Sequence, residues 1–483
     1  MTIGVHLSII IIGIQIPVAF GKEMVSVCPS LGREVGKDGS STPMGQKLLF
    51  YILFVKRLLL VTSVIIVLLL DLARGQELPR PSMSQETEPR SLPTDYNMKA
   101  GPVLFNVTGS MEAEYIDNIG LTNTGAQSDF TLTPEVGVAA AWPVTKVNTL
   151  SLTTSLGYTK YLFHPQYDTG NILVAPNSML NFDVYVGNIK FNIHDQFSFQ
   201  QDPVNEAAFS NLVNFSRFEN VVGINALWDL NKVVLFASYD HINFISTQLQ
   251  TLGGTNLPDP NLLDYSADQV SASAEFHLSS TLIGGIEGAA SSRSYDHYTG
   301  DYTQWSAGPF IKLQVTQHIK VQASAGFQNV DSPNNFAGPG QVLPANVFQP
   351  GSSGSSIDSY YFDLSIDHEL NRYYLQRLSI GHDISLGILG EQSDTSYVTY
   401  TSSWKVNRNL NLALTLSYQD VSESGGLVAV SSYDDFSAGL QANFPVAKNL
   451  SGAAFYDFTD KFASQTDQGY EQNKIGLLFT YHF

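Results

Sequence analysis

Apolar and polar residues alternate with a period of two from residue 103 to residue 483, in stretches of about 9 to 15 residues. Between 410 and 419, four leucines and Tyr418 occupy every second position, with Asn, Ala, Thr, Ser and Gln between them. Successive side chains of a β-strand point to opposite faces, so this period predicts strands. Past residue 75 we find no run of about 18 apolar residues, the length that a membrane-spanning helix needs. The body of the chain is therefore predicted to be all-β.

The pattern predicts about 18 antiparallel strands, with 16 as the lower bound. The expected strands are 103–117, 129–142, 147–161, 179–188, 190–201, 215–229, 232–247, 264–278, 281–296, 302–315, 318–330, 357–369, 374–390, 394–406, 409–420, 432–445, 449–462 and 471–483. An even number of strands in an up-and-down barrel places both ends of the chain on the same rim.

The connections between these stretches alternate in length. Short turns, most of them with a basic residue, separate long polar loops. The short turns are 143–146, 187–190, 229–232, 316–318, 371–372, 406–408 and 446–448. Short turns on one rim and long loops on the other are typical of a single transmembrane β-barrel with short periplasmic turns and long extracellular loops.

Composition favours a lipid-facing barrel over a soluble sandwich. Charged residues make up only 14% of the chain and aromatic residues 11%, which is unlike an ordinary soluble surface. Trp142, Trp228, Trp305 and Trp404 lie near predicted strand ends, as in the aromatic girdles of outer-membrane barrels. Scattered core tryptophans are the alternative. A soluble, secreted β-rich protein would need a core on the face assigned here to lipid.

The chain ends in an alternating strand with Ile475, Leu477, Phe479, Tyr481 and Phe483 on one face. This ending resembles the C-terminal signal of Gram-negative outer-membrane β-barrels, and about 380 residues resemble the β-barrel porins of that class in architecture. The segment 132–138, followed by Trp142 and Pro143, resembles a strand-turn opening of such porins more weakly.

The resemblance implies a location in the cell outer membrane and contact with outer-membrane lipid. It also implies insertion by the barrel-assembly machinery, which would read Phe479, Tyr481 and Phe483 as the membrane-insertion signal. A homotrimer would bury an apolar wall of each barrel, and no strand stands out in the sequence as that wall.

The first 102 residues are interpreted as targeting and leader segments. Lys56 and Arg57 precede an apolar run at 58–70, and small residues precede Gln76, so 1–75 is read as an N-terminal extension with a signal peptide cleaved after Gly75. A retained membrane anchor at 48–70 is the alternative, although two cations within the span would be costly. The start could be Met1, Met24 or Met44. Residues 76–102 are Pro-rich and read as a disordered periplasmic leader before the barrel at 103–483.

Charge and cysteine content exclude several classes of function. A net charge of −19 excludes nucleic acid as a partner, because phosphate binding needs an excess of Lys and Arg. The single cysteine, Cys28, precedes the barrel, so no Cys-ligated metal or Cys nucleophile is expected there. Dipeptides such as His194-Asp195 point to opposite faces of a strand and cannot form a catalytic pair by themselves. We predict no enzyme, no cofactor and no metal site.

The predicted function is an outer-membrane channel for passive diffusion of small hydrophilic solutes, because side chains cannot close a barrel of about 16–18 strands. Acidic residues dominate the loops and outer halves of the strands, which favours cations. Pore-lining candidates by phase are Asp363, Asp367 and Asp383, with Lys312 and Arg377, and further Arg217 and Arg293, as partners of opposite charge. The longest loop, 331–356, could fold inward. The alternative is an occluded barrel that is structural or associated with polysaccharide export.

Overall fold

The computed structural model describes residues 8–11, 14–17, 96–201, 212–251, 260–296, 301–331, 356–388, 390–424, 431–464 and 468–483. The chain divides into two compact units, 1–64 and 65–483. In the first unit, strands β1 (Ser8–Ile11) and β2 (Ile14–Pro17) pair in antiparallel fashion. The predicted signal peptide and its cleavage site lie outside the described residues.

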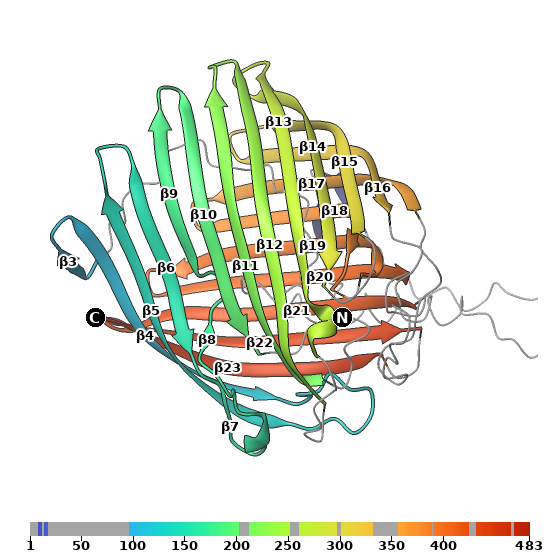
Figure 1. Cartoon of the computed structure of the whole chain (residues 1–483). Helices are drawn as coiled ribbons and strands as arrows, with labels where there is room; N and C mark the ends of the chain where they lie inside the picture. Colours follow the sequence, from blue (N-terminus) through green and yellow to red (C-terminus); the bar gives the residue numbers. More distant parts are fainter. Residues whose placement is uncertain are drawn as a thin grey trace, which may run out of the picture. The chain divides into compact units, whose positions relative to one another are not determined.

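The second unit is a closed antiparallel barrel of 18 long strands (Figure 1). These are β4 (Val103–Ile116), β5 (Asp129–Pro143), β6 (Thr149–Gly157), β9 (Met179–Val186), β10 (Ile189–Gln200), β11 (Leu212–Asp229), β12 (Val233–Thr251), β13 (Tyr265–His277), β14 (Leu282–Tyr295), β15 (Asp301–Gln314), β16 (Ile319–Asp331), β17 (Ser356–Asn371), β18 (Tyr374–Leu386), β19 (Gln392–Asn407), β20 (Leu410–Ser424), β21 (Ser431–Ala447), β22 (Leu450–Ala463) and β23 (Tyr470–His482). Each pairs with the next in the chain, and β23 pairs with β4 to close the ring. The predicted fold class is confirmed.

Five short elements accompany the barrel strands. β3 (Met98–Ala100) pairs with β4, and β7 (Lys160–Tyr161), the 3-10 turn η1 (Pro165–Tyr167) and β8 (Leu173–Val174) lie between β6 and β9. A second 3-10 turn, η3 (Pro260–Leu263), precedes β13. No helix in the described part of the chain is long and apolar enough to cross a membrane.

The two rims of the barrel differ as the sequence predicts. On the short-turn rim, β9 and β10 are joined by residues 187–188, β17 and β18 by 372–373, and β21 and β22 by 448–449. On the opposite, long-loop rim, the connection from β6 to β9 covers 158–178. The beginning of β4 and the end of β23 both lie at the short-turn rim, since β23 runs antiparallel to β4 from Lys474 opposite Ile116 to His482 opposite Thr108.

The outward face of the barrel carries an apolar band. On β21, every second side chain from Val446 to Phe436 is apolar, and the next on that face is Asp434. Ten residues of strand extend about 33 Å, or about 25 Å along the axis of a barrel whose strands tilt by about 40°. That height equals the apolar band of outer-membrane barrels. The side chains between them, such as Asp435 and Gln441, point to the inside.

Tryptophans mark both edges of this band. Trp142, Trp228 and Trp404 point outward close to the short-turn rim and are 43%, 44% and 41% exposed. Trp305 points outward in the half nearer the long-loop rim. All four therefore lie on the outer surface and not in a core, which supports the interpretation as interfacial girdles.

Tyrosines at the long-loop edge of the band donate hydrogen bonds to polar side chains that lie closer to the long-loop rim on the neighbouring strand. The hydroxyls of Tyr239 and Tyr418 donate to Asp268 and Asp434, each at 2.7 Å. Tyr456 donates to Asn473 Oδ1 at 2.7 Å. Rings on the apolar side and hydroxyls among carboxylates are the arrangement that a water–lipid boundary favours.

Several boundaries differ from the sequence prediction: the expected strands 232–247 and 409–420, for example, continue to Thr251 and Ser424. Met98–Ala100 forms a strand inside the segment that we expected to be disordered, because Asn97 holds it against β4 through hydrogen bonds with Asn106 and Val107. The expected strand 147–161 ends at Gly157. The expected strand 374–390 ends at Leu386, where the chain turns away from the barrel wall toward the inside.

Aromatic rings lie flat over glycines of the neighbouring strand on the inner wall. A Cβ atom added to Gly381 would lie 2.5 Å from the Tyr397 ring, and one added to Gly285 would lie 2.3 Å from the Phe310 ring. The Tyr397 hydroxyl reaches Asp363 Oδ2 at 2.5 Å from this position. The glycine is thus required for the ring to lie along the wall instead of standing in the lumen.

Replacing Gly381 with Ala is expected to destabilise the barrel by about 1–3 kcal/mol, because the new methyl group displaces the Tyr397 ring. The measurement is the temperature at which the folded, fast-migrating form is lost in heat-modifiability electrophoresis. Gly170→Ala is the control, since nothing lies within 4 Å of the added atom there. Equal transition temperatures for both variants would show that the close approach of the Tyr397 ring to Gly381 does not contribute to the stability of the barrel.

Candidate functional site

The inner face of the barrel is lined by the polar side chains that alternate with the apolar band. On β10, Lys190, Asn192 and His194 point inward: Asn192 donates to Asp183 of β9 at 2.7 Å, and His194 Nε2 lies 2.9 Å from Asp240 of β12. Asp195, next in sequence to His194, points outward and accepts from Asn220 at 2.6 Å. Adjacent acid and histidine residues therefore do face opposite ways here. The chain is a closed β-barrel of the transmembrane type.

One part of the inner wall is strongly acidic. Asp457 of β22 is paired in register with Lys474 of β23, and Glu114 and Glu112 of β4 follow on the same inward face beside β23. On the other side of β4, Glu135 of β5 lies opposite Ser110. Carboxylates of Asp457, Glu114 and Glu112 thus lie on one stretch of the inner face with the Lys474 ammonium group, where the barrel closes, and Glu135 extends this stretch toward the short-turn rim. We call Glu112, Glu114, Glu135, Asp457 and Lys474 the acidic wall.

The acidic wall was not expected from the sequence. Its members belong to strands at opposite ends of the chain, and only the closing pair β23–β4 brings them together. The inward phase of Glu112 and Glu114 was readable from the alternation, since Met111 takes the outward phase and is 46% exposed. The proximity of the two chain ends was not readable from any local pattern.

A second part of the wall holds the residues that the sequence proposed for the pore. Asp367 of β17 and Arg377 of β18 are opposite each other in register and form a two-pronged ion pair, with Arg377 Nη2 at 2.9 Å from Asp367 Oδ2. Asp363 lies four residues farther along the same face and accepts from Tyr397. The Arg377 side chain is 55% exposed, so it presents charge to the interior.

Lys312 and Asp383 share the inward face with these groups. Lys312 of β15 is ion-paired with Glu275 of β13. Asp383 lies near the long-loop end of β18, where the Gln328 amide of β16 reaches its Oδ1 at 2.7 Å when the amide is oriented to satisfy both groups. All five candidates therefore lie on the inner face, and whether they line a conducting path stays a prediction.

Two further cations that we expected to oppose these acids are buried in the wall. Arg217 is 2% exposed and binds Glu219 Oε1 through Nε at 2.9 Å. Arg293 is fully buried and donates hydrogen bonds to the backbone carbonyl groups of Leu386, the last residue of β18, and Gly387. Neither presents an exposed charge, because each is used for packing within the protein.

The end of β18 and the chain between β18 and β19 bend into the barrel. Its carbonyl groups accept hydrogen bonds from inward-facing side chains: Gln304 Nε2 donates to Ile384 O at 2.9 Å, Arg293 Nη2 to Leu386 O at 3.1 Å, and the Tyr295 hydroxyl to Ile388 O at 2.9 Å. These donors belong to β14 and β15, three and four strands away. We call residues 384–388 and 390–392 the inward hairpin.

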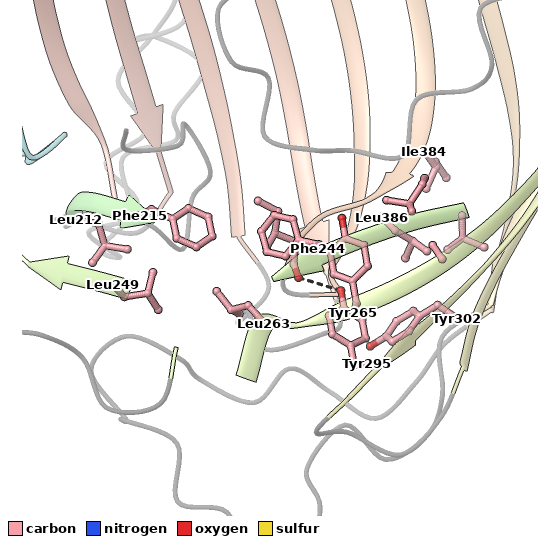
Figure 2. Packing of buried hydrophobic residues seen from close by; sticks show 14 residues of the cluster. Leu212, Phe215, Phe244, Leu249, Leu263, Tyr265, Tyr295, Tyr302, Ile384 and Leu386 are labelled. Atoms are coloured by element: carbon pink, nitrogen blue, oxygen red, sulfur yellow. Dashed lines mark hydrogen bonds between the residues drawn. The ribbon is translucent and has the colours of Figure 1, made fainter. Parts of the chain in front are cut away.

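An apolar cluster forms where the inward hairpin meets the wall, near the long-loop rim (Figure 2). Ile384 and Leu386 lie among aromatic side chains of β12 to β15. The cluster comprises Leu212, Phe215, Ile242, Phe244, Leu249, Leu263, Tyr265, Ala267, Tyr295, Tyr302, Val330, Ile384, Leu386 and Ile388. The inner wall of β12 to β15 on this side is therefore covered by packed apolar side chains.

The loop proposed from the sequence as an inward constriction, 331–356, lies outside the described residues except at its two ends. Sequence reasoning missed the inward hairpin instead. A signal was present: Ile384, Leu386 and Ile388 extend the apolar alternation beyond the height at which neighbouring strands turn polar, and Gly387 and Gly390 follow at once. Among the described residues, no group of three or more His, Cys, Asp or Glu is arranged to hold a metal ion.

No protein-family model matches the chain, and no curated protein sequence matches it. Among solved structures it is similar to OmpT, an outer membrane protein of Vibrio cholerae, with 12% identity, 80% of this chain and 99% of that chain covered, and a TM-score of 0.38. It is also similar to Pseudomonas aeruginosa OpdK with vanillate, with 9% identity, 78% of this chain and 98% of that chain covered, and a TM-score of 0.41. Acinetobacter baumannii OccAB3 is similar with 8% identity, 78% of this chain and 99% of that chain covered, and a TM-score of 0.41. The fold assignment rests on the strand pairing of this chain itself.

Proposed function

We propose that this protein is an outer-membrane channel through which small hydrophilic solutes diffuse passively. The observation that carries the proposal is the division of the barrel wall into an outward apolar band about 25 Å high and an inward polar face. A barrel of 18 strands is too wide for side chains from its wall to fill. Water and small polar solutes are then the natural contents of the interior.

A preference for cations is the second part of the proposal. The acidic wall supports it, because carboxylates of one sign along a lumen with low-dielectric walls raise the local concentration of counter-ions. The net charge of −19 and the acidic long loops act in the same direction at the long-loop mouth. On the wall at β17 and β18, Asp367 and Arg377 neutralise each other, so this pair adds no net charge to the inner face.

The same proposal includes signal-peptide export and assembly as a homotrimer. It also includes a translation start at Met1, Met24 or Met44 and insertion by the barrel-assembly machinery through Phe479, Tyr481 and Phe483. The outward position of Phe479 and Tyr481 supports the insertion role, since both are exposed at the short-turn rim. The occluded structural barrel remains the competing function, and the apolar cluster at the mouth is the feature that would suit it.

The test is single-channel conductance of the full chain, extracted from outer membranes in detergent and inserted into a planar bilayer under a tenfold gradient of potassium chloride. We expect stable open channels whose reversal potential has the sign of cation selectivity. A heat-modifiable barrel that inserts and stays silent would reject the channel. Open channels without selectivity, or with anion selectivity, would reject only the cation preference.

A further inference from the structure

The inward hairpin leaves its own part of the wall and packs on the inner face of strands three and four positions away. β18 is separated from β15 by β16 and β17, and from β14 by three strands. Neighbouring strands lie about 4.8 Å apart, so contacts from the end of β18 to β15 and β14 bridge about 14 to 19 Å of wall. The contacts are made with side chains of the inward phase, so the hairpin lies inside the barrel.

Its height in the barrel is also defined. Gln304 and Arg293 lie ten or more residues from the short turns that end β15 and begin β14, at the level of the outward Trp305. The inward hairpin therefore narrows the interior near the long-loop edge of the apolar band. Toward the short-turn rim, the wall carries the Asp367–Arg377 and Glu275–Lys312 ion pairs.

Polar contacts hold the hairpin backbone at several points. Besides the bonds to the carbonyl groups of Ile384, Leu386 and Ile388, Arg293 Nη1 donates to the carbonyl oxygen of Gly387. Gln392 Nε2, on the hairpin itself, donates to Val330 O of β16 at 3.4 Å. We call Arg293, Tyr295 and Gln304 the latch residues.

Arg293 is the central latch residue. Its guanidinium lies 4.2 Å from the centroid of the Tyr265 ring, and Nη1 donates to the Tyr295 hydroxyl at 3.1 Å. A buried cation is tolerated only where donors find acceptors and the charge finds a compensating surface. The hairpin carbonyls supply those acceptors, so moving the hairpin away would leave the guanidinium without them.

Apolar packing adds to the polar contacts. Ile384, Leu386 and Ile388 are 1%, 0% and 0% exposed, and full burial of such a side chain contributes about 1.5–3 kcal/mol. The hairpin is thus fixed from two sides: by its side chains in the apolar cluster and by its carbonyl groups on the latch residues.

We propose that the inward hairpin is the size-limiting element of the channel, and that Arg293 is the positioning residue that holds it against β14 and β15. This inference rests on the proposed function. Solutes would pass between the hairpin and the remaining wall, and their size limit would be set by how far the hairpin extends from β18. Loss of the latch would let the hairpin move and widen the opening.

The experiment compares wild type, Arg293→Met and Tyr295→Phe combined with Gln304→Leu, each as the full chain in planar bilayers and in liposomes with sugars of graded size. We expect Arg293→Met to raise conductance by about twofold or more and to admit larger sugars, and the milder double variant to shift both in the same direction. Lys461→Met is the matched control. Lys461 is also a buried cation over a tyrosine, 3.9 Å from the Tyr433 ring, and it lies on β22, away from the hairpin.

Heat-modifiability of each variant establishes that it is folded. If Arg293→Met does not fold, the inference is tested with the double variant alone. Wild-type conductance and size limit in the folded latch variants would overturn the inference and leave the channel function standing. An equal rise with Lys461→Met would overturn it too, since general loosening would then explain the effect. A silent wild type with open latch variants would support the hairpin as a plug and reject the passive channel.

Discussion

The combined variant Glu112→Gln, Glu114→Gln and Asp457→Asn is expected to abolish most of the cation preference, moving the reversal potential in a salt gradient close to zero or to the anion side. These substitutions leave Lys474 as the main charge of the acidic wall besides Glu135. Charges that line a lumen concentrate counter-ions, and removing them removes that concentration. The amides keep the size of the side chains, so folding should be little affected.

The measurement is best made at low ionic strength, because the Debye length is about 10 Å at 0.1 M salt and about 30 Å at 0.01 M. Asp268→Asn combined with Asp434→Asn is the matched control, since it removes carboxylates from the outward face near the long-loop rim. A reversal potential unchanged by the three lumen substitutions would show that selectivity arises elsewhere, such as in the loops.

The second large effect is expected from Phe479→Ala, Tyr481→Ala and Phe483→Ala together, which should reduce the amount of folded protein in the outer membrane about tenfold or more. These residues end the strand that closes the barrel, and Tyr481 and Phe483 contact each other with ring centroids 5.1 Å apart. Phe483 also lies against the backbone of β4 at Gly109. The measurement is the heat-modifiable band in isolated outer membranes.

Two comparisons separate recognition from stability. Phe444→Ala with Val446→Ala truncates outward apolar side chains at the same rim on β21 and should have a small effect on assembly. Refolding of the C-terminal variant from urea into detergent, where no assembly machinery acts, should also be close to wild type. Loss of refolding in detergent would instead assign these aromatic residues a purely structural role.

Much of the barrel could be predicted from the sequence, because the two faces of every barrel strand have opposite requirements for polarity. Every second residue meets lipid and the others meet water, so the alternation along 410–419 or 432–445 defines strand, phase and approximate length at once. Each connection then has to return the chain to the same sheet, which gives the order of strands without further information. The structure confirms this order and the count of 18.

The alternation also carried information on the interior, but only residue by residue. It placed Asp363, Asp367 and Arg377 on one face, where the structure places them. It could not tell that Arg217 and Arg293 are buried, because Arg217 is enclosed by side chains of two neighbouring strands and Arg293 by the inward hairpin. It could not reveal the acidic wall, because Glu114 and Asp457 become neighbours only when β23 meets β4.

The inward hairpin was the largest departure from the sequence prediction. Residues 374–390 have strand periodicity to their end, and a regular strand was the simplest reading. What redirects the chain at Leu386 is the set of donors on β14 and β15, about 80 to 94 residues earlier in the sequence. A period-two pattern describes which face a side chain takes and contains nothing about a strand that leaves its sheet.

The position of the inward hairpin near one rim makes the pathway asymmetric along its axis. In the proposed orientation, the narrow part faces the outside of the cell, and the wider, charged part opens to the periplasm. A bulky cation added from the periplasmic side could then travel far into the electric field before it meets the obstruction, whereas the same cation added outside would stop almost at once. Block by the cation should accordingly depend steeply on voltage when it is added from the periplasmic side and weakly when it is added from the outside.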